Sequence, residues 1–222
     1  MKKSASLILL VLCLTLNSFS QEFVINLNDL VSETQIMSED PDRMCFVWWI
    51  PDEYWAASLA GDPESAGEVG TILEVLGQYT VFSIADGEIG PYGNVDYVPL
   101  NAMLENVRVT DKHGDVFKPL TDKEVGGDAK NFLAMMKPMF ASMLGPMGEN
   151  MQFILFPKEN LEGKRLLDPF SEGEFGVSLF EETIKFSNPL GSLYAPKSCP
   201  IDGKKWNGTW TYCPKHGEKL GE

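Results

Sequence analysis

The sequence predicts a mainly β fold of the α+β class: an antiparallel β-sandwich-like body with inserted helices, followed by a small C-terminal module. Short runs of β-branched and aromatic residues recur along the chain, and Gly, Pro and Asp turn signals separate them. Amphipathic segments between those runs have helical spacing. The 222 residues are 44% hydrophobic and 23% charged, which is typical of a globular chain.

The first twenty residues are typical of a secretory signal peptide. Lys2 and Lys3 precede an apolar run over 7–16, and small residues stand just before Gln21, where we expect cleavage. The apolar run is shorter than the roughly 20 residues that span a bilayer. We therefore expect residues 1–20 to be removed, and the mature protein to be secreted or periplasmic without a membrane span.

The N-terminal half of the body contains three expected strands and two expected helices. Asp62 can cap the second helix, and Pro63 stands where no N–H donor is needed. Apolar residues at helical spacing give that helix one face for the core. The elements are a strand at 23–27, a strand at 44–50, a helix at 53–60, a helix from 62 to 77 and a strand at 79–85.

The second half continues with a hairpin, a long helix and further strands. Gly114 suits the left-handed position of the hairpin turn, and Pro138 is expected to kink the long helix. The elements are a hairpin of 107–110 and 116–118, a helix at 128–144, a strand at 151–156 and one or two strands within 175–186. The expected domains are a body at 21–190, a linker at 191–198 and a tail at 199–222.

The charge of the chain restricts the class of partner. There are 18 Lys and Arg against 32 Asp and Glu, a formal net charge of −14, which argues against nucleic acid or an anionic membrane surface. Residues 197–222 differ, with five lysines against three acidic residues. The expected partner is a protein, a peptide or a glycan.

An aromatic cluster is a candidate binding platform. It consists of Trp48, Trp49, Tyr54 and Trp55. Adjacent residues of a strand point to opposite faces, so one of the first two tryptophans belongs to the core. The other lies under the short helix or is exposed, where it could stack on a sugar or a peptide.

Methionines are concentrated in one segment. Six of the ten methionines fall within residues 135–151. Thioethers at M-x3-M spacing can bind Cu(I). The favoured interpretation is core packing, because Phe132, Met135, Met136, Met139, Phe140 and Met143 follow the spacing of a core-facing helix stripe.

The strongest local signal lies in the tail. Residues 199–203 and 213–217 are the same pentapeptide, C-P-x-(ligand)-G, and Asn207-Gly208 between them is a strong hairpin turn signal. A hairpin centred on Asn207-Gly208 places Asp202 opposite Cys213, and Cys199 opposite His216. The four side chains then converge at the hairpin base, and together they are competent to bind Zn²⁺.

These two boxes resemble those of a zinc ribbon, whose knuckles normally have the sequence C-P-x-C-G. The resemblance covers only Cys199 to about Leu220, and Asp202 and His216 replace the second cysteine of each box. It implies a metal-stabilised β-hairpin module that serves as a structural or docking element, and it implies no activity. The alternative is a Cys199–Cys213 disulfide, which an oxidising compartment favours. Cys45 is the third cysteine of the mature chain.

Sequence signatures of enzymes are largely absent. There is no G-x-S-x-G, H-E-x-x-H, P-loop or dinucleotide-binding motif. The sequence therefore favours a non-enzymatic exported protein with a structural zinc site. The alternatives are a periplasmic protein that handles zinc or copper through the tail or the Met-rich helix, and a hydrolase whose carboxylates the sequence does not single out.

Overall fold

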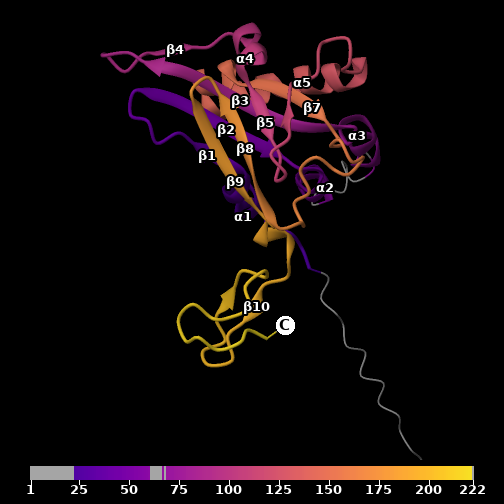
Figure 1. Cartoon of the computed structure of the whole chain (residues 1–222), viewed down its shortest axis with the longest axis vertical. Helices are drawn as coiled ribbons and strands as arrows, with labels where there is room; N and C mark the ends of the chain where they lie inside the picture. The colour runs from indigo at the N-terminus through magenta and orange to yellow at the C-terminus, as the bar shows by residue number, and fades with distance from the viewer. Residues whose placement is uncertain (1–22, 61–66, 68, 222) are drawn as a thin grey trace, which may run out of the picture.

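A computed structural model describes residues 23–60, 67 and 69–221 (Figure 1). The expected signal peptide at 1–20 and the expected helix start at Asp62-Pro63 lie outside the described residues. Within the described part, no helix combines the length and the apolar character that a bilayer span requires. The fold is α+β with antiparallel sheets, as the sequence predicts.

Two antiparallel sheets form the body. In the first, four strands run in the order β1, β2, β3, β4, and a fifth, β7, also pairs with the long central β3. Its strands are β1 (Gln35–Met37), β2 (Arg43–Ile50), β3 (Tyr79–Ile89), β4 (Val95–Tyr97) and β7 (Gln152–Pro157). The second sheet has the order β6, β5, β8, β9. Its strands are β5 (Arg108–Thr110), β6 (Val116–Phe117), β8 (Gly173–Leu179) and β9 (Glu182–Asn188).

The alternation of side chains along β2 divides the hydrophobic core into two layers. Cys45, Val47 and Trp49 face the second sheet, where they pack with apolar residues of β5, β8 and β9. The intervening residues of β2 belong to the cluster beneath the helices. The five-stranded sheet is therefore buried on both faces, which explains why the sequence of β2 is apolar almost throughout.

Helices occupy the connections between the strands, and several of them cover one face of the first sheet. They are α1 (Leu27–Thr34), α2 (Asp52–Ala60), α3 (Val69–Leu76), α4 (Leu100–Asn106), α5 (Gly127–Leu144) and α6 (Pro146–Asn150). The expected strand at 23–27 is wrong, because Asn26 caps α1 instead and its Oδ1 accepts from the N–H of Asn28 at 3.0 Å. No expected helix corresponds to α4. The junction of α5 and α6 requires Gly148, since a Cβ there would lie 2.0 Å from the carbonyl oxygen of Phe140.

Only half of the stripe expected on α5 faces the core, because Phe132, Met136 and Phe140 pack there and the other three methionines do not. Ala129, Leu133 and Phe140 are buried, whereas Met135, Met139 and Met143 are exposed by 67%, 43% and 69%. At 100° per residue, the exposed methionines lie about a quarter turn from the buried residues. The periodicity correctly predicted a helix at this place, but the core takes only one edge of the expected stripe together with Ala129 and Leu133.

The tryptophans proposed as a binding platform are core residues. Trp48, Trp49 and Trp55 are all buried. Trp49 packs edge-on against Phe175 of the second sheet at 5.0 Å between ring centroids, while Trp48 packs on Tyr54 beneath the helices at 5.1 Å. The two adjacent tryptophans do point to opposite faces, but both faces are covered, so neither ring is available to a ligand at the surface.

The segment expected as a linker is tied to the body at its start. The short 3₁₀ helix η1 (Gly191–Leu193) lies against α1. The Glu33 carboxylate of α1 accepts from the N–H groups of Gly191 and Ser192 at 3.1 and 3.0 Å, and from the Ser192 hydroxyl at 2.6 Å. The chain then enters the tail through β10 (Lys197–Ser198), at one end of the body (Figure 1).

Candidate metal centre

The two C-P-x-(ligand)-G boxes fold into two loops of the same geometry. In the first, Gly203 donates its N–H to the Cys199 carbonyl at 2.9 Å; in the second, Gly217 donates to the Cys213 carbonyl at 2.8 Å. Both glycines have positive φ, 70° and 71°. A residue with a Cβ is strained in this conformation, which explains the glycine at the end of each box. The repeated pentapeptide is thus a repeated loop.

The strand pairing of the tail differs from the expected hairpin. β10 pairs with β11 (Lys205–Trp206), so the first box is the turn of its own strand pair. A bridge between Tyr212 and Lys219 closes the second box in the same way. The hairpin centred on Asn207-Gly208 is therefore wrong.

Asn207 and Gly208 form a turn that docks the tail on the body. Asn207 Oδ1 accepts from the Thr209 N–H at 2.9 Å. A Cβ at Gly208 would lie 2.6 Å from the Tyr194 Cβ, and a Cβ at Gly191 would lie 1.8 Å from Asn207 Nδ2. The Asn-Gly pair is needed for this close approach to the segment that follows β9, and a strand pairing across it would remove the contact.

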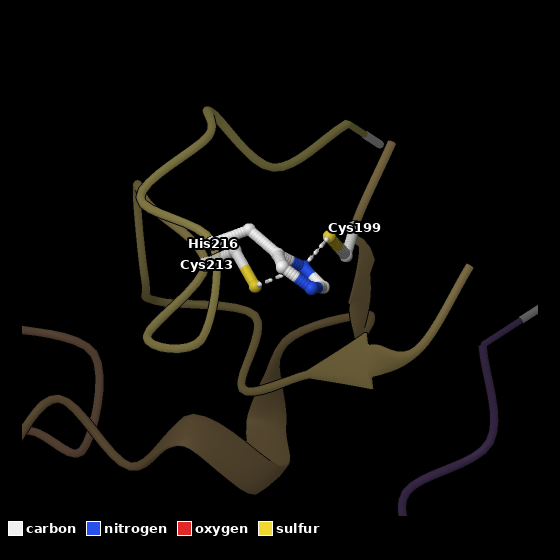
Figure 2. Close-up of side chains that lie close together, drawn as sticks. All are labelled: Cys199, Cys213 and His216. Carbon is white, nitrogen blue, oxygen red and sulfur yellow. Dashed lines mark hydrogen bonds between the residues drawn. The ribbon is translucent and has the colours of Figure 1, made fainter. Parts of the chain in front are cut away.

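Cys199, Cys213 and His216 converge despite the different pairing (Figure 2). Their candidate ligand atoms all lie within 4.8 Å of one another. His216 Nδ1 lies 3.2 Å from the Cys199 sulfur and 3.7 Å from the Cys213 sulfur. Both cysteines are buried and all three cysteines of the described chain are free thiols. This group can hold a metal ion, and it is the one such cluster of His, Cys, Asp or Glu side chains in the part of the chain that the structure describes.

Backbone N–H groups face each sulfur of the cluster. Burial raises the pKa of the Cys199 thiol, although the N–H groups of Asp202 and Ile201 oppose this effect. Burial also acts to raise the pKa of the Cys213 thiol, but the N–H groups of His216 and Lys215 and the neighbouring Cys199 outweigh it, so that this pKa is lowered. The loops thus favour a thiolate at Cys213, and thiolate is the form of cysteine that binds metals.

Asp202 lies at the edge of the cluster. Its Oδ2 is 3.9 Å from His216 Nδ1 and 3.3 Å from the Lys215 ammonium. The Lys204 N–H, which donates to Oδ1 at 3.1 Å, is the main cause of a lowered pKa at Asp202. The aspartate is therefore favoured as a carboxylate, but it is not one of the three residues whose ligand atoms lie within 4.8 Å of one another, so the expected convergence of all four side chains is met by three.

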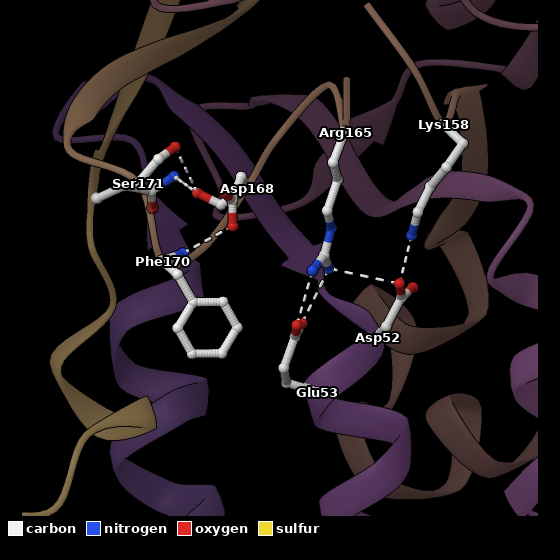
Figure 3. A network of polar contacts seen from close by, with 8 residues as sticks. Asp52, Glu53, Lys158, Arg165, Asp168, Phe170 and Ser171 are labelled. Carbon is white, nitrogen blue, oxygen red and sulfur yellow. Dashed lines mark hydrogen bonds and ion pairs between the residues drawn. The ribbon is translucent and has the colours of Figure 1, made fainter. Parts of the chain in front are cut away.

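A second polar cluster, which the sequence analysis missed, lies in the body (Figure 3). Arg165 donates to both oxygens of Glu53 at 2.7 and 2.9 Å, and it lies 3.5 Å from Asp52. Lys158 pairs with the same Asp52. Each of these four charged side chains has a partner of opposite charge within the cluster. The cluster therefore holds the start of α2 against the loop after β7. No sequence motif indicates this cluster, because the acidic residues and their basic partners are more than 100 residues apart in the chain.

The other histidine of the chain, His113, lies in the turn between β5 and β6, outside the cluster of the tail. It lines a cavity of about 360 Å³ between the β5–β6 turn and the loop before β8, together with Lys112, Arg165 and Asp168. It is thus not part of the metal centre. The aromatic residues of the tail are a second feature that the sequence analysis passed over: Trp206 and Trp210 stack at 5.8 Å, with the Lys204 ammonium above Trp206.

Comparison with known proteins adds no relative. No protein-family model, no curated protein sequence and no solved structure matches this chain.

Proposed function

We propose that this chain is an exported, non-enzymatic binding or structural protein whose C-terminal module is held together by one zinc ion. The ligands are Cys199, Cys213 and His216, with Asp202 as the fourth. The observation that carries the proposal is the convergence of two sulfurs and an imidazole nitrogen at the bends of two identical loops.

The distances within the cluster suit a tetrahedral zinc ion. Zn–S bonds of about 2.3 Å and Zn–N bonds of about 2.0 Å imply a sulfur–nitrogen separation of about 3.5 Å. The two separations are 3.2 and 3.7 Å. Asp202 Oδ2 lies 3.9 Å from His216 Nδ1 but outside the group of three mutually close ligand atoms, so this carboxylate has to move toward the sulfurs to complete the tetrahedron.

A structural role for the ion follows from the size of the tail core. The buried apolar residues of the tail are Cys199, Cys213 and Leu220, with Trp206 packed against them. So small a core cannot offset the conformational entropy of folding, and small modules of this kind use a metal ion or a disulfide instead. Binding free energy at such a site is folding free energy.

Export is the part of the proposal that rests on residues 1–20. An oxidising compartment makes a Cys199–Cys213 disulfide the competitor of zinc. The two N–H groups at each sulfur favour the zinc form, since they stabilise thiolates and a disulfide carries no charge.

Metal analysis and thiol counting on the purified mature protein test the proposal. We expect one zinc per chain and three thiols after denaturation in chelator. Cys213→Ser should release the zinc and broaden the amide NMR signals of residues 197–221. Cys45→Ala, the matched control, should keep the bound zinc and the sharp signals of these residues. One thiol and no metal would establish the disulfide and overturn the proposal.

The fourth ligand has its own test. Asp202→Cys restores the C-P-x-C-G pattern of a zinc ribbon, so it should tighten zinc binding in a competition with a chelating dye. Asp202→Asn should weaken it, because a neutral amide oxygen is a poorer zinc ligand. Equal affinities for Asp202→Asn and the natural chain would assign the fourth position to another group, with zinc still held by three ligands.

A further inference from the structure

The exposed methionines of α5 form an apolar surface on the body. Met135, Met139 and Met143 recur every fourth residue and are exposed by 67%, 43% and 69%. An exposed helix face normally carries charged residues. In the last fourteen residues of α5 the single charged residue is Lys137.

Lys137 lies away from the methionines. Its ammonium donates to Gln152 Oε1 of β7 at 2.9 Å. On a helix at 100° per residue, position 137 lies opposite to the centre of the methionine face. The thioethers therefore have no cation beside them on their own helix, and the chain as a whole is strongly acidic. Both features favour the approach of a positive ion.

Core packing does not account for these side chains. The core side of α5 consists of Ala129, Leu133 and Phe140, with Phe132 and Met136 partly buried beside them. The three exposed methionines add nothing to that layer. What distinguishes them from other apolar residues is the sulfur atom, a soft and polarisable donor that selects Cu(I) over harder ions.

We propose that Met135, Met139 and Met143 form a surface site for one Cu(I) ion. Side chains four residues apart on a helix have Cβ atoms about 5–6 Å apart, so two flexible thioethers can enclose an ion between them. The triplet offers two overlapping pairs, Met135 with Met139 and Met139 with Met143. Met139 belongs to both pairs, so the site holds one ion at a time with Met139 as the common ligand.

The site is independent of the proposed zinc centre, and it predicts a particular order of effects. Met139→Leu destroys both pairs and should weaken Cu(I) binding by about tenfold or more. Met135→Leu and Met143→Leu each leave one pair and should have smaller effects. Leucine keeps the apolar surface and the helix propensity, so these variants separate metal binding from the docking of an apolar partner.

NMR of the full chain, zinc-loaded and labelled at the methionine methyl groups, provides the test. Cu(I) is added under reducing, oxygen-free conditions, and signals are assigned by the leucine variants. We expect the methyl signals of Met135, Met139 and Met143 to shift together and to saturate at one ion beyond any bound by the tail. Met136→Leu, on the same helix, is the matched control and should leave the shifts unchanged.

Two results would overturn the proposal. The first is that the three methyl signals do not respond to Cu(I), or respond without saturation. The second is that Met139→Leu has no larger effect than Met136→Leu. Because the methyl signals report on α5 alone, a failure here leaves the zinc measurement intact, and loss of zinc from the tail does not mimic it.

Discussion

The buried thiol of Cys45 should make the stability of the protein fall steeply above pH 9. Cys45 is fully buried between the two sheets and pairs across the ladder with Asp86. Burial, followed by the Asp86 charge, raises the pKa of this thiol from 9.0 to about 12, although Arg43 opposes the effect. The folded protein therefore keeps the thiol protonated over a range in which the unfolded chain ionises it.

The sign and the size of the effect follow from proton linkage. Above pH 9 the unfolded state binds fewer protons at Cys45 than the folded state, so the free energy of unfolding decreases as the pH rises. The loss is about 0.4 kcal/mol at about pH 9 and about 1.4 kcal/mol at about pH 10. It levels off near pH 12, at about 4 kcal/mol. Below pH 8 the contribution is negligible.

Urea unfolding of the natural chain and of Cys45→Ala measures the effect. The alanine variant carries a pH-independent loss from the missing sulfur, so the informative quantity is the difference between the two chains as the pH changes. The natural chain should lose about 1.4 kcal/mol more than the variant between pH 7 and about pH 10, a midpoint shift of about 0.5 M urea. Parallel losses in the two chains would show that the folded state ionises this thiol, and would refute the reasoning.

Three further perturbations address the body, the docking of the tail and the loops of the metal centre. Gly148→Ala should destabilise the body by about 2–3 kcal/mol because its Cβ has no room, whereas Gly127→Ala at an open helix position should be neutral or stabilising; thermal unfolding compares them. Glu33→Gln should lower the free energy of unfolding by about 1–2 kcal/mol and speed amide hydrogen exchange at Gly191 and Ser192, whose N–H groups donate to the Glu33 carboxylate. Unchanged exchange at these two residues would contradict the docking role of Glu33. Gly203→Ala should weaken zinc binding about fivefold through backbone strain. Gly93→Ala, at a similarly positive φ in the body, should leave zinc affinity unchanged in a chelator competition.

Much of the body could be predicted from the sequence because its strands carry their signal locally. The β2 run of apolar residues, the turn at Gly114 and the helical spacing of α5 each depend on neighbours within a few residues. The predictions that failed depend on residues that are distant in the sequence but in contact in the fold. The face of α5 that becomes buried is chosen by the sheet beneath it, and Phe132, Met136 and Phe140 satisfy the same periodicity as the exposed methionines.

In the tail, too, the local motifs were predicted correctly and the long-range pairing was not. Its two boxes are local motifs, and the sequence correctly predicted that Cys199, Cys213 and His216 would converge. The pairing used to bring them together was wrong, because the Asn207-Gly208 turn serves a contact with Gly191 and Tyr194, outside the tail. A turn signal states that the chain reverses, but it does not state whether the flanking segments pair with each other.

The distribution of buried residues determines how much of the chain would unfold on loss of a metal ion from the tail. The body has two large apolar clusters, one between the sheets and one beneath the helices, and neither includes a residue after Tyr194. The tail has a separate cluster of three buried residues. Its contacts with the body include the close approach of Asn207 to Gly191, and Gly191 itself donates a hydrogen bond to Glu33 of α1. On the proposal that the tail binds zinc, removal of the ion should therefore unfold residues 197–221 while the sheets persist.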